Sequence, residues 1–411
     1  MTYLPNPAVT IGGVNFTGNT VGEVTVSRGR RTVYERTNAG FASIDLIDVT
    51  GIPTFTVGDE VQVQIDRADF LWSEAATSWS GMGGSWSAAV PVAFVPSPIF
   101  TGTLSDWSSE TTPARDRPIV RYRLQAVGPL ATLNRRQILF DGRVSENDAE
   151  RVGAVLTAAL GTAIYDPTLV DPGVFTLAAL ATADAGYSAL TTAQNAAFSG
   201  EGLLFETEDG NIGYQDADRR RTNERTEILT IPFATLSAEG IQVLQQLADI
   251  TNTVTVSFEG GAVTEVDQSS IDAFGLFDTE LSTQLVNLSN AEVRAKNFLS
   301  QHAVPSRNLE ELRFRLRGVD DDDLRNALLD VAVSDALRVT GVPAPVGFTQ
   351  FRGFVEGVRL TVNDFDLRLS LTVSDRRLSI AAERWGQVDG TIAWQDVDAT
   401  LTWQDATEVT V

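Results

Sequence analysis

Few residues of this chain could carry catalytic chemistry. The 411-residue sequence has no cysteine and one histidine, His302, which excludes disulfides, thiolate metal sites and cysteine nucleophiles. A histidine dyad or a histidine-rich metal site would lack its second member. His302 follows the apolar pair Phe298-Leu299 at an expected helix end, where a histidine commonly binds free backbone carbonyls. Neither Gly-x-Ser-x-Gly nor His-Glu-x-x-His occurs.

The acidic residues are too numerous to nominate a catalytic pair. Among 54 carboxylates, a pair such as Asp216 and Asp218 could act as a glycosidase couple only if the fold held them about 5–10 Å apart across a cleft. Asp320 to Asp323 lack the alternate-oxygen spacing and the distal glutamate of a calcium loop, and acids favour a helix start. We therefore expect no enzyme, no cofactor and no metal site.

Charge limits the partners of the chain. A net charge of −23 argues against tight wrapping of nucleic acid, because neutralising phosphates requires lysine and arginine. One basic island, Arg219, Arg220 and Arg221 with Arg225 close behind, stands out. It is either the solvated end of a hairpin or a docking point for a neighbour's carboxylates. An exposed ion pair contributes only about 0–1 kcal/mol unless an interface buries it.

Two tryptophan clusters are the other unusual features. Trp72, Trp79 and Trp86 lie seven apart in a run rich in Ser, Gly and Ala; they form an exposed patch for a partner or a sugar, or a loop folded over its own tryptophans, and we favour the loop. Near the end of the chain, Trp385, Trp394 and Trp403 lie nine apart, the last two within Trp-Gln-Asp units. Two short strands seldom stand alone in water, so this tail must pack on its own chain or on a partner, and we favour a partner.

The elements around these residues are mainly strands. Runs such as 21–26, 42–47 and 60–65 alternate apolar and polar residues, which predicts a sandwich or barrel. Phe100-x-Gly102 opens one strand of a hairpin whose second strand contains Arg123-Leu124. Phe351-x-Gly353, 251 positions later, opens a second hairpin with Arg368-Leu369 in its partner strand. This spacing points to duplication of a whole domain.

Between the two hairpins the pattern changes to helix plus hairpin. Ser145-Glu146-Asn147-Asp148 has the form of a capping box before a helix, and a second helix is expected from Ser188 to Phe198, stopped by Gly200. Asp209-Gly210 between alternating runs predicts a hairpin. After strand 252–258, Ser289-Asn290-Ala291-Glu292 predicts another helix start, and Glu311–Arg317 places its apolar residues on one strand face.

The sequence thus predicts a mainly β fold with an α+β insertion, made of two β-barrel or sandwich domains and a short Trp-rich β tail. The expected boundaries are 1–133 for the first β-domain with its Trp-rich insertion at 70–96, 134–230 for the middle domain, 231–384 for the second β-domain with inserted helices, and 385–411 for the tail.

This order resembles the tail hub (baseplate hub, or tail-associated minor tail) proteins of long-tailed bacteriophages and related contractile injection systems. The residues that carry the resemblance are Val24–Arg30 with Ala42–Leu46, the two Phe-x-Gly hairpins, Gly202–Phe205 leading to Asp209-Gly210, and the Trp-Gln-Asp tail. Minor tail proteins of actinobacterial phages have similar stretches. The resemblance covers most of the chain through pattern rather than through an invariant motif.

The resemblance implies that the two β-domains are copies of the tail-tube fold. Three chains would close into a ring whose six β-domains match the six-fold tail tube or distal tail protein above and offer three-fold symmetry to a fibre or minor tail protein below. The middle domain would lie outside or beneath the ring, and DNA would pass without specific binding. Each hairpin should superpose on the other, related by roughly 60° in the trimer.

The expected location follows from the same resemblance, namely the tail tip of a virion assembled in the host cytoplasm. No run approaches 18 uninterrupted apolar residues, and the first residues lack the regions of a signal peptide, so no membrane insertion is expected. The alternative function is a receptor- or glycan-binding minor tail protein, because tryptophan faces stack well on sugars.

Overall fold

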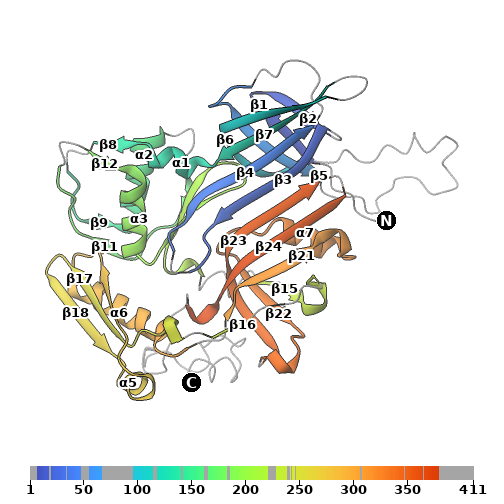
Figure 1. Ribbon diagram of the computed structural model, residues 1–411. Coiled ribbons are helices and arrows are strands. Elements are labelled where there is room, and N and C mark those ends of the chain that lie inside the picture. Colours follow the sequence, from blue (N-terminus) through green and yellow to red (C-terminus); the bar gives the residue numbers. More distant parts are fainter. Residues whose placement is uncertain are drawn as a thin grey trace, which may run out of the picture.

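The structure is a computed structural model, and it describes residues 7–17, 20–33, 35–47, 55–66, 96–113, 118–139, 142–161, 165–182, 186–220, 228–237, 241, 243–245, 247–305, 308–346, 348–363 and 365–378. These residues form a mainly β protein with a helix-containing middle segment, as the sequence predicts (Figure 1). No described helix is long and apolar enough to span a membrane.

The first β-unit comprises strands β1 to β7. Their bounds are β1 Pro7–Ile11, β2 Val14–Thr17, β3 Val21–Gly29, β4 Asn38–Ile47, β5 Glu60–Asp66, β6 Pro96–Thr112 and β7 Ile119–Val127. Alternation explains these strands: in β4, Ala42, Ile44 and Leu46 face the core while the residues between them are more exposed.

The second β-unit comprises the strands near the far end of the chain and one helix. Their bounds are β15 Ile228–Pro232, β16 Val243–Leu244, β20 Asn308–Leu309, β21 Glu311–Arg315, α7 Asp322–Leu329, β22 Ala336–Thr340, β23 Gln350–Asn363 and β24 Asp366–Asp375. The four aspartates begin α7, as predicted: Asp321 is the N-cap and accepts the backbone N–H groups of Asp323 and Leu324.

The two units share one large sheet. Its strand order is β15-β22-β23-β3-β4-β7-β6-β5-β1-β2, with β24 paired to β23 and β21 paired to β24. Within it, β4-β7-β6-β5 and β21-β24-β23-β22 are two runs of four antiparallel strands in the same order. One buried hydrophobic cluster, which we call the first core, contains residues of both units. The two units differ in the strand that follows these runs. In the first unit β1 pairs antiparallel with β5, whereas in the second unit β15 pairs parallel with β22.

The predicted Phe-x-Gly hairpins are β6–β7 and β23–β24, and they follow the same plan. A Cβ on Gly102 would lie 2.7 Å from the Phe100 ring, and a Cβ on Gly353 would lie 2.8 Å from the Phe351 ring. Each glycine also lies under a backbone oxygen from the second strand or its end, 2.4 and 2.1 Å from the same Cβ position. In both hairpins the ring occupies the space that a side chain would need.

Each hairpin also has a β-bulge, and the two bulges lie at corresponding positions. The bulged residue is Ser105 in β6 and Glu356 in β23, and each lies five positions after its phenylalanine, Phe100 or Phe351. A bulge bends a strand at a defined point and is retained as part of the design of a sheet. The matched bulges therefore support a common plan; superposition of the two hairpins stays a prediction.

The middle segment contains helices and short strands between the two hairpins. The bounds are α1 Pro129–Asn134, β8 Gln137–Ile138, β9 Glu146–Asn147, α2 Asp148–Leu160, β10 Tyr165–Val170, β11 Thr176–Leu177, β12 Tyr187–Ser188, α3 Ala189–Ser199, β13 Leu203–Glu206 and β14 Ile212–Gln215. The helix capped by Ser188 and ended at Gly200 and the hairpin around Gly210 are as predicted.

The capping box of α2 lies two residues later than predicted. Asn147 is the N-cap, its side chain accepts the backbone N–H of Glu150 at 2.7 Å, and Glu150 accepts the backbone N–H of Asn147 at 3.0 Å. Ser145 instead donates its hydroxyl to the carbonyl of Leu177. The same two-residue error occurs at the later helix, whose N-cap is Asn287 rather than Ser289.

An inserted α/β segment follows β16. It consists of β17 Thr253–Phe258, β18 Gly261–Val266, α5 Gln268–Phe274, β19 Asp278–Ser282 and α6 Leu288–His302. Val254, Val256 and Leu281 of this segment pack with α2 and α3 in another buried hydrophobic cluster, which we call the second core. The contacts thus group residues 254–295 with the middle segment, although they fall within the predicted 231–384 domain. The predicted domain boundaries stay a prediction.

Short 3-10 turns complete the described chain: η6 Phe233–Thr235, η7 Leu247–Asp249, η8 Leu316–Gly318, η9 Ala344–Val346 and η10 Arg376–Leu378. Leu312, Phe314 and Leu316 are buried as predicted, although the strand ends at Arg315 and Leu316 begins η8.

Candidate functional site: the junction of the two β-units

The two β-units meet where β3 pairs with β23. The N-terminal part of β23 pairs with β22, and its C-terminal part, from Gly357 to Val362, pairs antiparallel with Gly29 to Val24 of β3. Since β24 occupies the other edge of β23, β22 and β3 lie one after the other along a single edge. Figure 1 shows β3 beside β23 in the middle of the molecule.

Two glycines, Gly29 of β3 and Gly357 of β23, allow the two strands to approach closely at this junction. Gly29 has φ +92°, and a Cβ there would lie 2.3 Å from the carbonyl oxygen of Glu356 and 2.8 Å from the Cα of Gly357. The next residue, Arg30, donates its backbone N–H to that same Glu356 carbonyl at 2.8 Å. A side chain at position 29 would push β3 off the bulge, so glycine is required there.

The bulge places the Glu356 carboxylate in a fully buried position between two guanidinium groups. Arg30 Nε lies 2.6 Å from Oε2, and Arg220 donates to Oε1 at 2.7 Å and to Oε2 at 2.9 Å. Ser374 Oγ donates to Oε1 at 2.6 Å. Burial alone would raise the pKa of Glu356, but the charges of Arg220 and Arg30 and their hydrogen bonds outweigh it and hold the pKa well below its usual range.

Further contacts fix the orientation of the Arg220 guanidinium group. Its Nε donates to Ser334 Oγ at 3.0 Å, and its guanidinium carbon lies 5.1 Å from the centre of the Phe354 ring. The network of Arg30, Arg220 and Glu356 therefore joins the first β-unit, the end of the middle segment and the second β-unit at one buried point. Bidentate geometry of this kind fixes orientation as well as charge balance.

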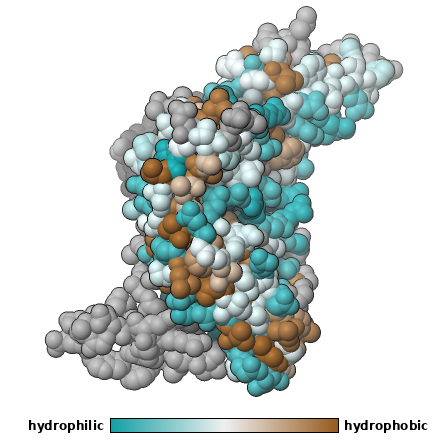
Figure 2. Space-filling model, turned by 90° about the vertical axis from the view of Figure 1, so that its left-hand side faces the viewer, coloured by the Kyte–Doolittle hydropathy of each residue, from teal (hydrophilic) through white to brown (hydrophobic). Residues whose placement is uncertain are grey.

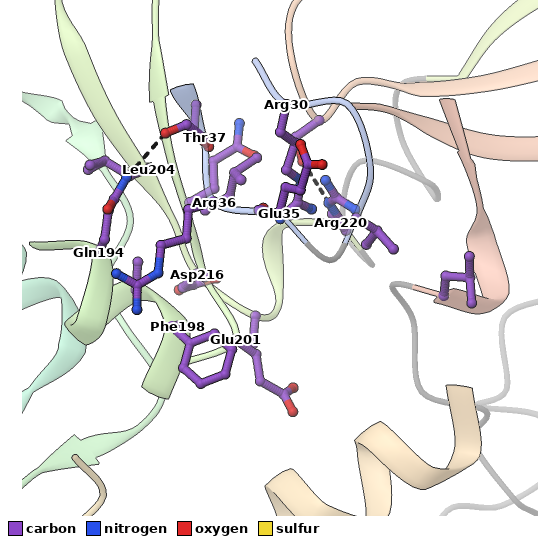
Figure 3. A pocket seen from close by; sticks show the side chains of 18 of the residues that line it. Arg30, Glu35, Arg36, Thr37, Gln194, Phe198, Glu201, Leu204, Asp216 and Arg220 are labelled. Atoms are coloured by element: carbon purple, nitrogen blue, oxygen red, sulfur yellow. Dashed lines mark hydrogen bonds between the residues drawn. The ribbon is translucent and has the colours of Figure 1, made fainter. Parts of the chain in front are cut away.

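A cavity of about 320 Å³ lies beside this network and is lined by the first β-unit, the middle segment and α6 (Figure 3). Gln194 Nε2 donates to the carbonyl of Thr37 across it, at 3.1 Å. Arg294 on the far wall pairs with Glu201 at 2.7 Å. The charges that line the cavity thus largely balance one another within the chain.

His302 is also on the cavity wall and ends α6, as the sequence predicts. Its ring stacks on Phe298, and Nδ1 lies 2.7 Å from the Phe298 carbonyl. Burial lowers the pKa of His302 to about 4, although the hydrogen bond to Phe298 opposes this. The imidazole is therefore neutral near pH 7 and serves the helix end.

A second buried carboxylate attaches the middle segment to the first β-unit. Glu206, at the end of β13, accepts the backbone N–H of Gly40 through Oε2 and that of Leu130 through Oε1, each at 2.6 Å. Burial raises the pKa of Glu206 to about 7 although these N–H groups lower it. Nearby, Arg28 Nη2 of β3 lies 2.7 Å from Oε1 of Glu208. The β13–β14 hairpin is thereby docked on β3 and β4.

The basic island does not act as one unit. Arg220 is buried and paired with Glu356 of its own chain, rather than forming a solvated hairpin end. The sequence could not show this, because its partner lies 136 residues away. The Arg219 side chain is 47 % exposed and lies 3.6 Å from Asp171. Arg221 lies outside the described residues, and a role in a partner interface stays a prediction for Arg219 and Arg221.

Of the other candidate residues, some are described by the structure and some are not. Asp216 organises a turn, since it accepts the backbone N–H groups of Asp218, Arg219 and Gly173. The tryptophans Trp72, Trp79 and Trp86 of the candidate aromatic patch, and Trp385, Trp394 and Trp403 of the tail, lie outside the described residues. Among the residues that the structure describes, no group of three histidines and carboxylates could hold a metal ion.

Glu356 and Glu206 are the functional residues that sequence reasoning missed. Glu356 interrupts the apolar run Phe354-Val355-Glu356-Gly357-Val358, and a charge inside such a run is a signal for either a bulge or a buried ion pair. Glu206 ends the apolar strand Leu203–Glu206, where only its burial in the fold distinguishes it from an ordinary hairpin residue.

The outer face of the middle segment and of β17–β18 offers no comparable organisation. Figure 2 shows hydrophobic side chains there in separate patches among hydrophilic ones. Exposed apolar residues of these segments include Leu139, Val144 and Val266. Scattered apolar side chains are ordinary on a protein surface, so the organised chemistry of the described chain is concentrated at the junction.

We compared the chain with protein-family models, curated proteins and solved structures. No protein-family model matches the chain, and no curated protein matches its sequence. Among solved structures, the tail protein of Neisseria meningitidis MC58 is similar with TM-score 0.62 and 11% identity, covering 92% of this chain and 98% of that one. The 43 kDa tail protein of prophage MuSo2 from Shewanella oneidensis gives TM-score 0.60 and 10% identity, covering 91% and 100%.

A third similar structure is prophage tail protein gp18 of Listeria monocytogenes, with TM-score 0.50 and 7% identity, covering 89% of this chain and 94% of that one. The similarity spans nearly the whole of each chain, so it concerns the complete arrangement of β-units, junction and middle segment. At these identities it establishes the fold.

Proposed function

We propose that this chain, which has the fold of phage tail proteins, is a structural hub of a phage tail tip. Three copies form a ring of six β-units that adapts the six-fold tail tube to three-fold distal components and continues the DNA channel. The observation that supports this most directly is the presence of two β-units in one chain with the same strand order and the same bulge.

The junction suits this role physically. A ring requires a fixed angle between successive units, and the strand pairing of β3 with β23 together with the buried Glu356 network sets that angle within each chain. A contact between unlike surfaces, repeated from copy to copy, generates a closed ring when its rotation closes. Three chains with two units each then present six similar positions to the tube.

The charge of the chain suits a channel component. With a net charge of −23, a ring of three copies repels DNA phosphates rather than holding them, so DNA passes without specific binding. In this proposal the neighbours are the tail tube or distal tail protein on one side and a fibre or another minor tail protein on the other. The chain acts by assembly and not by catalysis, in the tail tip of the virion.

The mass of the purified protein tests the proposal. Light scattering or native mass spectrometry over a concentration series should give a species of three times the 44.3 kDa chain mass. An image of the intact tail tip should show this chain with three-fold symmetry. A protein that stays monomeric at high concentration, or a tail tip with another symmetry at this chain, would overturn the proposal.

A further inference from the structure

The second β-unit contains a counterpart of β3. Because the two hairpins match residue for residue around their bulges, β4 of the first unit corresponds to β20 and β21 of the second, and Phe41 corresponds to Leu309. In the first unit Phe41 pairs with Ser27 of β3, and in the second Leu309 pairs with Val243 of β16. The short strand β16 therefore occupies the place that β3 occupies in the first unit.

The two counterparts differ in their outer edge. β3 pairs with β4 on one edge and with β23 on the other. Among the described residues, β16 pairs only with β20. Its other edge is where, by correspondence, a strand equivalent to β23 belongs.

The first β-unit has the complementary open edge. The counterpart of the C-terminal half of β23 is the stretch Asp106–Thr112 of β6, which pairs with β7 on one edge. β5 reaches only as far as Thr103, and no described strand pairs with the outer edge beyond the bulge. All residues from Asp106 to Thr112 are exposed, whereas most of Gly357–Asn363 is buried under β3.

These two open edges are the two halves of the contact that β3 and β23 already make inside the chain. They cannot meet within one molecule, because β6 and β16 lie in separate parts of it (Figure 1). We propose that β16 of one copy pairs antiparallel with β6 of the next copy, so that the intrachain junction is repeated between chains. The proposal rests on the proposed hub function and names the surfaces that close its ring.

The correspondence also predicts the register. Arg359 lies opposite Ser27 in the chain, so its counterpart Ser108 should lie opposite Val243 of the next copy. One position earlier, Trp107, whose surface is 39% exposed, should face the half-buried Leu244 of the next copy. An aromatic side chain opposite an aliphatic one on a sheet stabilises the pair, and a partner strand removes the hazard of an open edge.

Engineered disulfides test the pairing, because the chain contains no cysteine of its own. Opposite residues of antiparallel strands have Cα atoms about 4.5–5.5 Å apart, which a disulfide can bridge. Ser108→Cys combined with Val243→Cys should give covalent dimers and trimers on oxidation, seen on a non-reducing gel. The matched intrachain pair, Ser27→Cys with Arg359→Cys, should lose its free thiols and remain a monomer on that gel.

Each outcome is decisive. The single variants Ser108→Cys and Val243→Cys should give no ladder up to trimer. If Val243→Cys disturbs folding, as judged by its unfolding midpoint, Trp107→Cys with Leu244→Cys tests the adjacent pair. A trimer in solution without cross-linking in either double variant overturns the inference and leaves the hub proposal standing. A monomer without cross-linking overturns both, and a covalent ladder beyond three chains supports the strand pairing but overturns the closed ring.

Discussion

Glu356 shows why a buried charge network matters at a junction. Removing a carboxylate and two guanidinium groups from water costs free energy, and the network offsets this only while every member is paired. Here Arg30 comes from the first β-unit, Arg220 from the end of the middle segment, and Glu356 from the second β-unit. The network therefore stabilises one relative placement of the β-units, since any displacement leaves a charge unpaired.

Replacement of Glu356 should consequently be severe. Glu356→Gln leaves Arg30 and Arg220 facing each other without a counter-charge, and we expect it to lower the free energy of unfolding by about 3–5 kcal/mol. Urea unfolding followed by tryptophan fluorescence measures this. The control is Lys296→Gln, because the Lys296 side chain is 55% exposed and its ammonium lies 3.9 Å from Glu265, and loss of such a surface pair should change stability by less than about 1 kcal/mol. Equal effects of the two substitutions would contradict the assigned role of Glu356.

Glu206 and His302 should give the protein opposing pH dependences. The pKa of Glu206 is raised from 4.5 to about 7 by burial, so the folded chain binds this proton more tightly, and the stabilisation is full below pH 4.5 and lost as pH rises to 7. The pKa of His302 is lowered from 6.5 to about 4 by burial. The stabilisation of the folded state by neutral His302 is complete above pH 6.5 and is lost as the pH falls toward 4.

Variants separate the two groups. Between about pH 5 and 6.5, the stability of Glu206→Gln should rise more steeply with pH than that of the parent chain, and the stability of His302→Gln should rise less steeply or fall, each differing from the parent by about 1–2 kcal/mol over the range. Urea midpoints at three pH values measure the slopes. Parallel slopes for parent and variants would show that neither group titrates in the expected window.

The corresponding glycines of the two hairpins, Gly102 and Gly353, allow a quantitative test of the common plan. Gly102→Ala and Gly353→Ala each place a Cβ against a phenylalanine ring and a backbone oxygen, and overpacking of this kind costs about 1–3 kcal/mol. The control Gly318→Ala meets nothing within 4 Å. We expect similar losses of unfolding free energy for the first two variants and almost none for the control; a loss at only one hairpin would contradict the common plan.

The elements also show which parts of the fold could be predicted from sequence. Alternating runs, the Asp209-Gly210 turn and the Ser188 cap are local signals, and the structure confirms the elements they predict. The helix starts at Asn147 and Asn287 were missed by two residues because serine and asparagine cap equally well. The parallel pairing of β15 with β22 joins residues about a hundred positions apart, and no local pattern encodes it.

The junction could be predicted only in part for the same reason. Val24–Arg30 and the Phe351 hairpin were recognisable as strands, but their pairing with each other depends on the whole fold. Arg220 belonged to a visible basic cluster, yet its burial depends on Glu356 from a distant strand. Periodicity assigns a residue to a face of its own strand, and it carries no information on which strand that face meets.

Among the described residues, the molecule has one completed junction, between β3 and β23, and two strand edges, on β6 and β16, that lack the corresponding partner. The C-terminal half of β23 is paired on both edges, with β24 and β3. Its counterpart in β6 is paired with β7 alone among the described strands. If the ring forms as proposed, the two stretches become equivalent only after assembly, and this difference can be followed by amide exchange.

Hydrogen exchange should therefore report ring closure at one stretch. In the monomer, the amides of Asp106–Thr112 that face the open edge exchange rapidly, whereas those of Gly357–Asn363 are protected by partners on both edges. On assembly, the first stretch should gain protection and the second should change little, as measured by mass spectrometry at low and high protein concentration. Residues 357–363 serve as the internal control. Assembly that leaves exchange at 106–112 unchanged would mean that the copies meet through a different surface.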